Sequence, residues 1–360
     1  MPANMRSTLP VVSFAERDHV LEAVYHLLGG PSPVAQRSIA RFFAPEMPKF
    51  DELFDACRLP SPATLRYPLD DGDNRIGADT EVLVVRRREV SEELIASLPR
   101  LRHVQKLGTR TDTVDTSAAQ ARNINVQYIS RPSLEATADH ALLMILAGLK
   151  DLPDLESELR AHARRESHKR GSQGAVAYNW TNATGRSLCG STVGIVGLGE
   201  VGLLLAKRLL ACGANVLWTS VRGQRGQRGV PAGLVYTELS DLLARSHAVS
   251  LHVPWVRETA DLVDADFLDQ MRRDGILVNV SRGAIVDEVA LASALRNGSI
   301  RGACLDVFKT EPLGPDSPIL GAPRTILTPH VAGGQRSLIV EELIRTAQGI
   351  SNALNGEVAV

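Results

Sequence analysis

The chain has 360 residues, of which 44% are hydrophobic and 22% are charged, and its formal net charge is −1. The length allows roughly two or three domains with cores of their own, and the composition is that of an ordinary globular protein. A charge near zero and an aromatic content of 4% argue against a nucleic-acid surface. No apolar run approaches the roughly 20 residues that span a bilayer, so no membrane partner is expected.

The cysteine pattern and the first residues predict a cytoplasmic location. The segment 1–6 lacks the apolar core of a signal peptide, which argues against export. The cysteines are scattered without the C-x-x-C spacing of a zinc site, so we expect no metal and predict reduced, packed thiols. These cysteines are Cys57, Cys189, Cys212 and Cys304.

Strands and helices alternate in the first third of the chain. Residues 1–78 mix apolar runs with prolines and predict no firm architecture beyond a helix at 20–28. Strands are predicted at 81–85, 103–107 and 125–129, with helices between them that begin after Ser91 and near Thr116. This order indicates an α/β unit.

Two stretches of opposite polarity follow. From 133 to 149 a helix with apolar residues on nearly every face is expected to be buried between domains or subunits. Residues 160–174 are basic and polar. Because no aromatic side chain is interleaved there, a solvated loop is favoured over a nucleic-acid patch.

The second half is organised around Val193–Gly202, a G-x-G-x-x-G motif between a predicted strand and a predicted helix. In this motif Gly197 permits a tight turn, Gly199 lets a pyrophosphate approach the backbone, and Gly202 lets helix and strand pack closely. The helix N-terminus adds free N–H groups. We therefore predict a dinucleotide site rather than a structural turn.

Regular alternation after Gly190 predicts a parallel sheet with helices on both faces. The expected strands are 193–197, 215–219, 248–252, 276–280, 302–306 and 325–328. The expected helices are 201–211, 239–245, 265–272 and 287–296, with a final helix at 338–354 that should pack on the N-terminal part.

The end of the second of these strands bears on the choice of dinucleotide. An NAD site normally has a carboxylate there for the ribose hydroxyls, but this chain has Ser220 and Arg222. NADP is therefore favoured over NAD, with both residues at the 2′-phosphate. A flexible surface loop rich in glycine and arginine is the alternative interpretation.

Three later strand ends carry polar residues suited to catalysis: Arg282, Glu311 and His330. A guanidinium can bind a carboxylate through two parallel hydrogen bonds, and an imidazole can exchange a proton near neutral pH. A glutamate beside the histidine would stabilise the imidazolium. A surface salt bridge, a turn cap and a packed loop histidine are the corresponding structural interpretations, and Asp306 could simply end its strand.

Together, the motifs at 193–202, 278–288, 305–313 and 327–333 resemble the D-isomer-specific 2-hydroxyacid dehydrogenase family over about residues 80–354. The resemblance implies a catalytic Arg282, Glu311 and His330, and substrate binding by Gly108, Thr109 and Arg282. It also implies that Asp306 contacts the nicotinamide amide. The predicted cofactor-binding residues are Gly197, Gly199, Glu200, Val201, Gly202, Ser220, Arg222, His252, Pro254, Thr259, Val280, Ser281, Asp306 and Gly333.

The resemblance further implies two α/β domains, with the active site in the cleft between them. A Rossmann-type, doubly wound cofactor domain at 133–334 would be inserted into a flavodoxin-like substrate domain formed by 1–132 and 335–360. A homodimer through the cofactor domains is implied, with the helix near Ala136–Leu149 as candidate interface.

The expected function is hydride transfer between NADP or NAD and a small 2-keto or 2-hydroxy acid such as glyoxylate or hydroxypyruvate. Phosphite oxidation with the same three residues is one alternative. Formate oxidation is disfavoured because the formate enzymes of the family carry Gln at the position of Glu311. A non-catalytic, NAD(H)-sensing protein related to corepressors is the alternative from another functional class.

Overall fold

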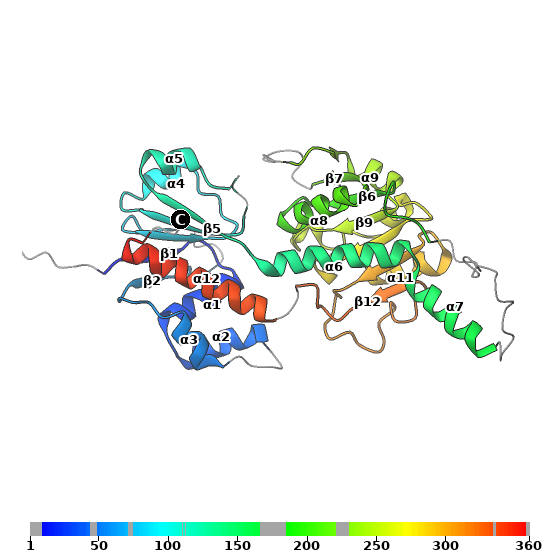
Figure 1. The fold of residues 1–360 in the computed structure, drawn as a ribbon, viewed down its shortest axis with the longest axis horizontal. Helices are drawn as coiled ribbons and strands as arrows, with labels where there is room; N and C mark the ends of the chain where they lie inside the picture. The colour runs from blue at the N-terminus through cyan, green and yellow to red at the C-terminus, as the bar shows by residue number, and fades with distance from the viewer. Residues whose placement is uncertain are drawn as a thin grey trace, which may run out of the picture. The chain divides into compact units, whose positions relative to one another are not determined.

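The computed structural model describes residues 9–43, 49–70, 75–109, 111, 113–165, 185–220, 230–333 and 336–357. The chain divides into two compact units, one formed by Met1–Ser133 with Gln335–Val360 and the other by Leu134–Gly334 (Figure 1). Each unit is built on one wholly parallel sheet flanked by helices. The predicted α/β fold class is confirmed.

The first unit has a five-stranded sheet in the order β2-β1-β3-β4-β5, the strand order of flavodoxin-like folds. Strands β1 and β3 at its centre are buried on both faces and consist almost wholly of β-branched and apolar residues. The strands are β1 Val11–Phe14, β2 Thr64–Arg66, β3 Val82–Val85, β4 His103–Leu107 and β5 Asn125–Ile129.

Helices cover both faces of this sheet. One core joins β1 and β3 to four helices, and the final helix α12 packs beside α1, as predicted (Figure 1). A second core joins the opposite face to α4 and α5. The helices are α1 His19–Gly29, α2 Pro33–Phe43, α3 Phe50–Ala56, α4 Glu92–Ser97, α5 Thr116–Ala121 and α12 Arg336–Asn355.

The N-terminal region is more regular than the sequence indicated. β1, β2, α2 and α3 were not predicted, because prolines interrupt the region and break its apolar pattern into short runs. The predicted start of α4 is confirmed, since the Ser91 hydroxyl accepts the backbone N–H of Leu94 at 3.3 Å.

The second unit has a seven-stranded sheet in the order β12-β11-β10-β9-β6-β7-β8. The strand order reverses between β6 and β9, and ligands of such sheets bind outside the carboxyl ends of the strands at this switch point. All six predicted strands are present, and the short strand β8 was not predicted. They are β6 Thr192–Val196, β7 Asn215–Thr219, β8 Leu234–Tyr236, β9 Ala248–Leu251, β10 Ile276–Asn279, β11 Gly302–Leu305 and β12 Thr325–Leu327.

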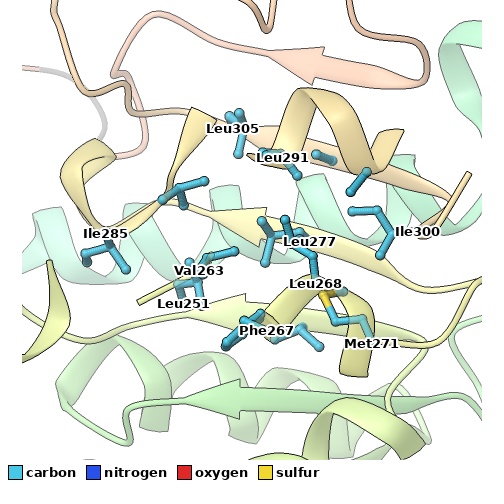
Figure 2. Packing of buried hydrophobic residues seen from close by; sticks show 14 of the residues in the cluster. Leu251, Val263, Phe267, Leu268, Met271, Leu277, Ile285, Leu291, Ile300 and Leu305 are labelled. Carbon is cyan, nitrogen blue, oxygen red and sulfur yellow. The ribbon is translucent and has the colours of Figure 1, made fainter. Parts of the chain in front are cut away.

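The two faces of this sheet carry separate cores. Side chains of α10 and α11 pack with Leu251, Leu277 and Leu305 on one face (Figure 2), and side chains of α9 belong to the same core. Residues of α6 and α8 pack with Ile276 and Val278 on the other, so neighbouring residues of β10 alternate between the cores. The helices are α6 Pro132–Leu149, α7 Leu152–Arg165, α8 Glu200–Ala211, α9 Leu239–Arg245, α10 Ala265–Gln270 and α11 Glu288–Asn297, with short 3₁₀ turns at Arg257–Thr259 and Gly283–Ile285.

One prediction about this unit was wrong in part, and one stays a prediction. Residues Arg160–Arg165 belong to α7 and not to a loop, because Leu152, Leu155 and Leu159 recur at helical spacing and Arg160 pairs with Glu156 one turn earlier. Residues 166–174 lie outside the described residues. On helix α6, Leu143 is 55% and Leu146 is 37% exposed, so this chain does not cover the face that carries them, and the predicted burial between subunits stays a prediction.

The cysteines also differ from expectation. All four are free, but Cys189 and Cys212 are exposed, and only Cys57 and Cys304 are packed thiols. Burial raises the pKa of both packed thiols to about 12. In the part of the chain that the structure describes, no His, Cys, Asp and Glu side chains gather into a metal site. None of the helices described there is long and apolar enough to cross a bilayer.

Candidate active site

The glycine loop between β6 and α8 has a different steric demand at each glycine. Gly197 has φ +98°, and a side chain there would lie 2.8 Å from the carbonyl carbon of His252. At Gly202 a Cβ would lie 2.4 Å from the carbonyl oxygen of Gly197. At Gly199, in contrast, no atom lies within 4 Å of the position that a Cβ would occupy, so a ligand can approach the backbone there.

The N-terminus of α8 begins at this open position. Gly199 is its N-cap residue and provides no side-chain cap for the N–H groups of the first turn. These N–H groups and the positive end of the helix dipole suit a phosphate group. The predicted Glu200 and Val201 follow in the same turn. The loop therefore fits the pyrophosphate of a dinucleotide.

The end of β7 lies beside the glycine loop. The carbonyl oxygen of Thr219 accepts the N–H of Gly197 at 2.9 Å, so Ser220 follows directly at the carboxyl edge of the sheet. This is where a dinucleotide's ribose would be recognised. Arg222, the second predicted 2′-phosphate contact, lies outside the described residues.

The loop after β9 faces the same switch point. His252 donates its backbone N–H to Val196, and its Nε2 lies 2.8 Å from the Ser250 hydroxyl. Burial lowers the pKa of His252 to about 4, so the imidazole is neutral at physiological pH. The Thr259 hydroxyl donates to the Pro254 carbonyl at 2.7 Å and is buried within the loop. Its hydroxyl thus shapes this loop.

Arg282 is presented by a turn that a buried asparagine holds. After β10, the Asn279 amide oxygen accepts the Ser281 N–H at 3.0 Å and the Ser281 hydroxyl at 2.8 Å. The Asn279 amide nitrogen donates to the Arg282 carbonyl at 2.9 Å. Val280 is buried beneath the turn, whereas Arg282 is exposed. Sequence reasoning missed Asn279, although a polar residue ending an apolar strand was a usable signal.

Gly283 brings this turn onto the loop that leaves β11. A Cβ on Gly283 would lie 1.9 Å from the carbonyl carbon of Phe308, so only glycine allows the two backbones to approach so closely. The Phe308 N–H donates to Oε1 of Glu311 at 2.9 Å, and Oε2 of Glu311 lies 2.6 Å from Nδ1 of His330. The turn that carries Arg282 therefore lies against the loop of Glu311, and Glu311 in turn contacts His330, while the Arg282 guanidinium itself donates to the Ser281 carbonyl at 2.6 Å.

His330 lies in a loop that Asp306 holds from below. The fully buried carboxylate of Asp306 accepts the N–H groups of Val331 and Ala332, both at 2.9 Å. It also accepts the Thr328 hydroxyl at 2.6 Å. The sequence assigned Asp306 to the nicotinamide; in the structure both of its carboxylate oxygens bind the loop that carries His330.

The remaining predicted residues lie at separate loop ends. Gly108, with φ +104°, and the exposed Thr109 follow β4 in the first unit. The N–H of Gly108 donates to the carbonyl of Ile129 at 2.8 Å, which holds this turn at the sheet edge. Gly333 ends the loop of His330 in the second unit, with open space where a Cβ would be.

The strand orders of the two sheets, the glycine loop and the polar strand ends define a two-unit protein with a Rossmann-type dinucleotide-binding fold. The family model for the NAD binding domain of D-isomer specific 2-hydroxyacid dehydrogenases matches residues 142–332. A glyoxylate reductase of Korarchaeum cryptofilum is 33% identical over 75% of this chain and 80% of its own length. The chain belongs to the D-isomer specific 2-hydroxyacid dehydrogenase family.

Other relatives differ in length or in similarity. A D-3-phosphoglycerate dehydrogenase of Mycobacterium leprae is 35% identical over 78% of this chain but 50% of its own length. The chain thus spans about half the length of the first curated relatives it matches. The structure of an NADPH-dependent glyoxylate/hydroxypyruvate reductase from Sinorhizobium meliloti, in complex with citrate, is 27% identical. The two structures superpose with a TM-score of 0.51, and the match covers 95% of this chain and 94% of the reductase chain.

Proposed function

We propose that this protein transfers a hydride between a nicotinamide dinucleotide and a small 2-keto or 2-hydroxy acid. The observation that carries the proposal is the chain of contacts from the Arg282 turn through Phe308 and Glu311 to His330. It brings a cation and an imidazole–carboxylate pair to the carboxyl edge of the sheet that bears the glycine loop. Reduction of a 2-keto acid needs a cation for the carboxylate and an acid for the developing alkoxide.

Each residue of this group has one role in the proposed reaction. Arg282 binds the substrate carboxylate and polarises the keto group. Because Glu311 accepts a hydrogen bond from Nδ1 of His330, Nε2 is the nitrogen that donates the proton in reduction and removes it in oxidation. Glu311 stabilises the imidazolium between these steps. The bound dinucleotide supplies or accepts the hydride.

The cofactor is proposed to be NADP in preference to NAD. No carboxylate follows β7, where Ser220 stands instead, and the structural relative from Sinorhizobium meliloti is named as NADPH-dependent. Ser220→Asp should repel the 2′-phosphate and shift the ratio of kcat/KM from NADPH toward NADH. Unchanged KM values for both cofactors would count against this placement.

The substrate is proposed to be small, as glyoxylate and hydroxypyruvate are. Relatives named glyoxylate reductase match this chain over 69–80% of their length, whereas the first relatives named D-3-phosphoglycerate dehydrogenase match over only about half of theirs. Gly108 and Thr109, at the end of β4, are proposed to bind the carboxylate together with Arg282. These two uncharged residues and one guanidinium suit a substrate that carries a single carboxylate.

The test is NADPH or NADH oxidation at 340 nm with a panel of 2-keto acids, beside reduction of NADP⁺ or NAD⁺ by phosphite. We expect turnover of a small 2-keto acid, and a loss of about 10²–10⁴ in kcat for His330→Ala with dinucleotide Kd unchanged. A fully active His330→Ala variant would contradict the proposed mechanism. Phosphite turnover alone would identify the other reaction, and tight dinucleotide binding without any turnover would identify a sensor.

We also propose that the protein is a homodimer formed through α6. Leu143 and Leu146, one helical turn apart, are exposed on α6, whereas Ala141 and Ile145 are buried in the unit's own core. Leu152 and Leu159 on α7 are exposed as well. Light scattering should give twice the mass of the chain, and Leu143→Glu with Leu146→Glu should give a monomer. A monomeric wild type would refute the interface.

A further inference from the structure

One residue, Asp306, binds most of the loop that carries His330. Its carboxylate accepts two backbone N–H groups and the Thr328 hydroxyl, and its carbonyl oxygen accepts the N–H of His330 at 2.8 Å. The side chain has no exposed surface. Every bond it makes therefore strengthens in a water-poor environment, and the loss of one would leave the carboxylate under-satisfied.

The loop needs this support because its backbone is strained at His330. The φ of His330 is +54°, in the left-handed region that non-glycine residues adopt at a cost of roughly 1–3 kcal/mol. Such a conformation persists only where surrounding contacts determine it. Here the contacts on both sides of His330, at Thr328 and at Val331, converge on Asp306.

A histidine from a distant helix extends this network. Nε2 of His140, on α6, lies 3.1 Å from the Thr328 hydroxyl oxygen and 3.6 Å from Oδ1 of Asp306. The Thr328 hydroxyl has one hydrogen, which it donates to Oδ1 of Asp306, so toward His140 it can only accept. His140 is consequently the donor, and its proton lies on Nε2. The chain of hydrogen bonds runs from His140 to Thr328 to Asp306.

We propose that His140 and Thr328 are positioning residues, which hold Asp306 in place and through it the imidazole of His330 against Glu311. Neither side chain needs to touch substrate or cofactor in this role. The inference rests on the proposed acid–base function of His330, because only then does the position of the imidazole affect a rate. The bond between His140 and Thr328 joins α6 to the loop that follows β12.

Two matched pairs of variants test the proposal. Thr328→Val keeps the shape and removes the hydroxyl, whereas Thr328→Ser keeps the hydroxyl. His140→Leu removes the donor, whereas His140→Gln places an amide N–H near the position of Nε2. We expect kcat to fall about 10-fold to 100-fold in the Val and Leu variants, by analogy with the loss seen when the hydrogen-bond partner of a metal-binding side chain is removed. The Ser and Gln variants should stay within about threefold of wild type, with dinucleotide Kd unchanged in all four.

A spectroscopic readout separates this proposal from the proposed function. In protein labelled with ¹³C-histidine, the His330 ring signal is identified among nine histidines by its loss in His330→Ala. It should move in Thr328→Val and His140→Leu and return in Thr328→Ser and His140→Gln, whether or not any substrate is turned over. An inactive wild type with these shifts would refute only the proposed function.

Several outcomes would overturn the positioning role. Wild-type kcat and an unmoved His330 signal in Thr328→Val would show that the network does not reach His330. Equal losses in both members of each pair would show that packing matters and the hydrogen bonds do not. A weaker dinucleotide Kd with kcat unchanged would make these residues part of the cofactor site. Because His140 is partly exposed, His140→Leu should fold, and circular dichroism checks this.

Discussion

Nδ1 of His330 lies 2.6 Å from Oε2 of Glu311, while Oε1 of the same carboxylate accepts the N–H of Phe308. Glu311 is therefore held at one oxygen by the backbone and presents the other to the imidazole. The pair is partly exposed, with half of the His330 side chain accessible to solvent. This arrangement sets the tautomer of His330 and leaves its other nitrogen for a reacting group.

Replacing the carboxylate by an amide should damage catalysis without unfolding the loop. In Glu311→Gln the amide oxygen can still accept from Phe308, but the NH₂ group would donate to Nδ1 and favour the wrong tautomer. We expect kcat to fall by about 10²–10⁴, the range seen when a catalytic histidine is held in the wrong tautomer. Glu92→Gln, the same change at an exposed position of α4, should leave kcat unaltered. A Glu311→Gln enzyme with wild-type kcat would contradict the assignment.

The glycine loop offers a way to separate cofactor binding from folding. Gly199→Ala meets no protein atom, so the free energy of unfolding should change by less than about 0.5 kcal/mol. The added methyl group would stand where a pyrophosphate approaches, and dinucleotide Kd should rise about tenfold or more, which is about 1.4 kcal/mol. Calorimetry for Kd and urea unfolding for stability measure the two effects.

Gly202→Ala supplies the opposite pattern. Its Cβ would lie 2.4 Å from the Gly197 carbonyl oxygen, so β6 and α8 must separate, at a cost of about 1–3 kcal/mol of unfolding free energy. Gly314→Ala, which meets no atom within 4 Å, is the matched control. Equal effects of Gly199→Ala and Gly202→Ala on stability would show that the loop has no open side.

The contact between Gly283 and Phe308 should matter for both stability and substrate binding. Gly283→Ala would place a Cβ 1.9 Å from a backbone carbon, so the two loops must move apart, with a loss of about 2 kcal/mol or more. Because Arg282 moves with the turn, KM for the 2-keto acid should rise more than dinucleotide Kd. Gly321→Ala, in open space, is the control. An unchanged KM for the 2-keto acid would contradict the proposed binding of the substrate by Arg282.

His252 makes stability depend on pH in a defined direction. Burial lowers its pKa to about 4 in the folded protein, from about 6.5 in the unfolded chain, so below pH 6.5 the unfolded chain binds more protons. The stability gained from keeping His252 neutral is present above pH 6.5 and is lost progressively as the pH falls toward 4. Between pH 7 and pH 5 wild type should lose about 2 kcal/mol more than His252→Gln.

Urea unfolding of both proteins at the two pH values measures this difference. His19→Gln, at an exposed position, controls for the removal of one imidazole. Parallel pH dependence of wild type and His252→Gln would mean that the His252 ring is not held in its buried, neutral state.

Local patterns were sufficient to predict much of the second unit. Strand periodicity located β6, β7, β9, β10, β11 and β12 to within about two residues, and the glycine spacing predicted the turn at Gly197 and the close packing at Gly202. β1 and β8 are no shorter than β9 and β12, but they escaped because they lie outside the regular alternation of strands and helices that located the others. Helix α7 escaped because its polar face dominates its composition.

What the sequence by itself determined about this protein is its α/β class, its family and the polar residues at its strand ends, because each depends on residue types at short or regular spacing. Only the tertiary structure decided that Gly283 lies on Phe308, that Asn279 holds the turn of Arg282, and that His140 bonds to Thr328. The last pair is separated by 188 positions in the chain. Such contacts depend on which strands lie next to one another in the sheet, and no local sequence pattern encodes that arrangement.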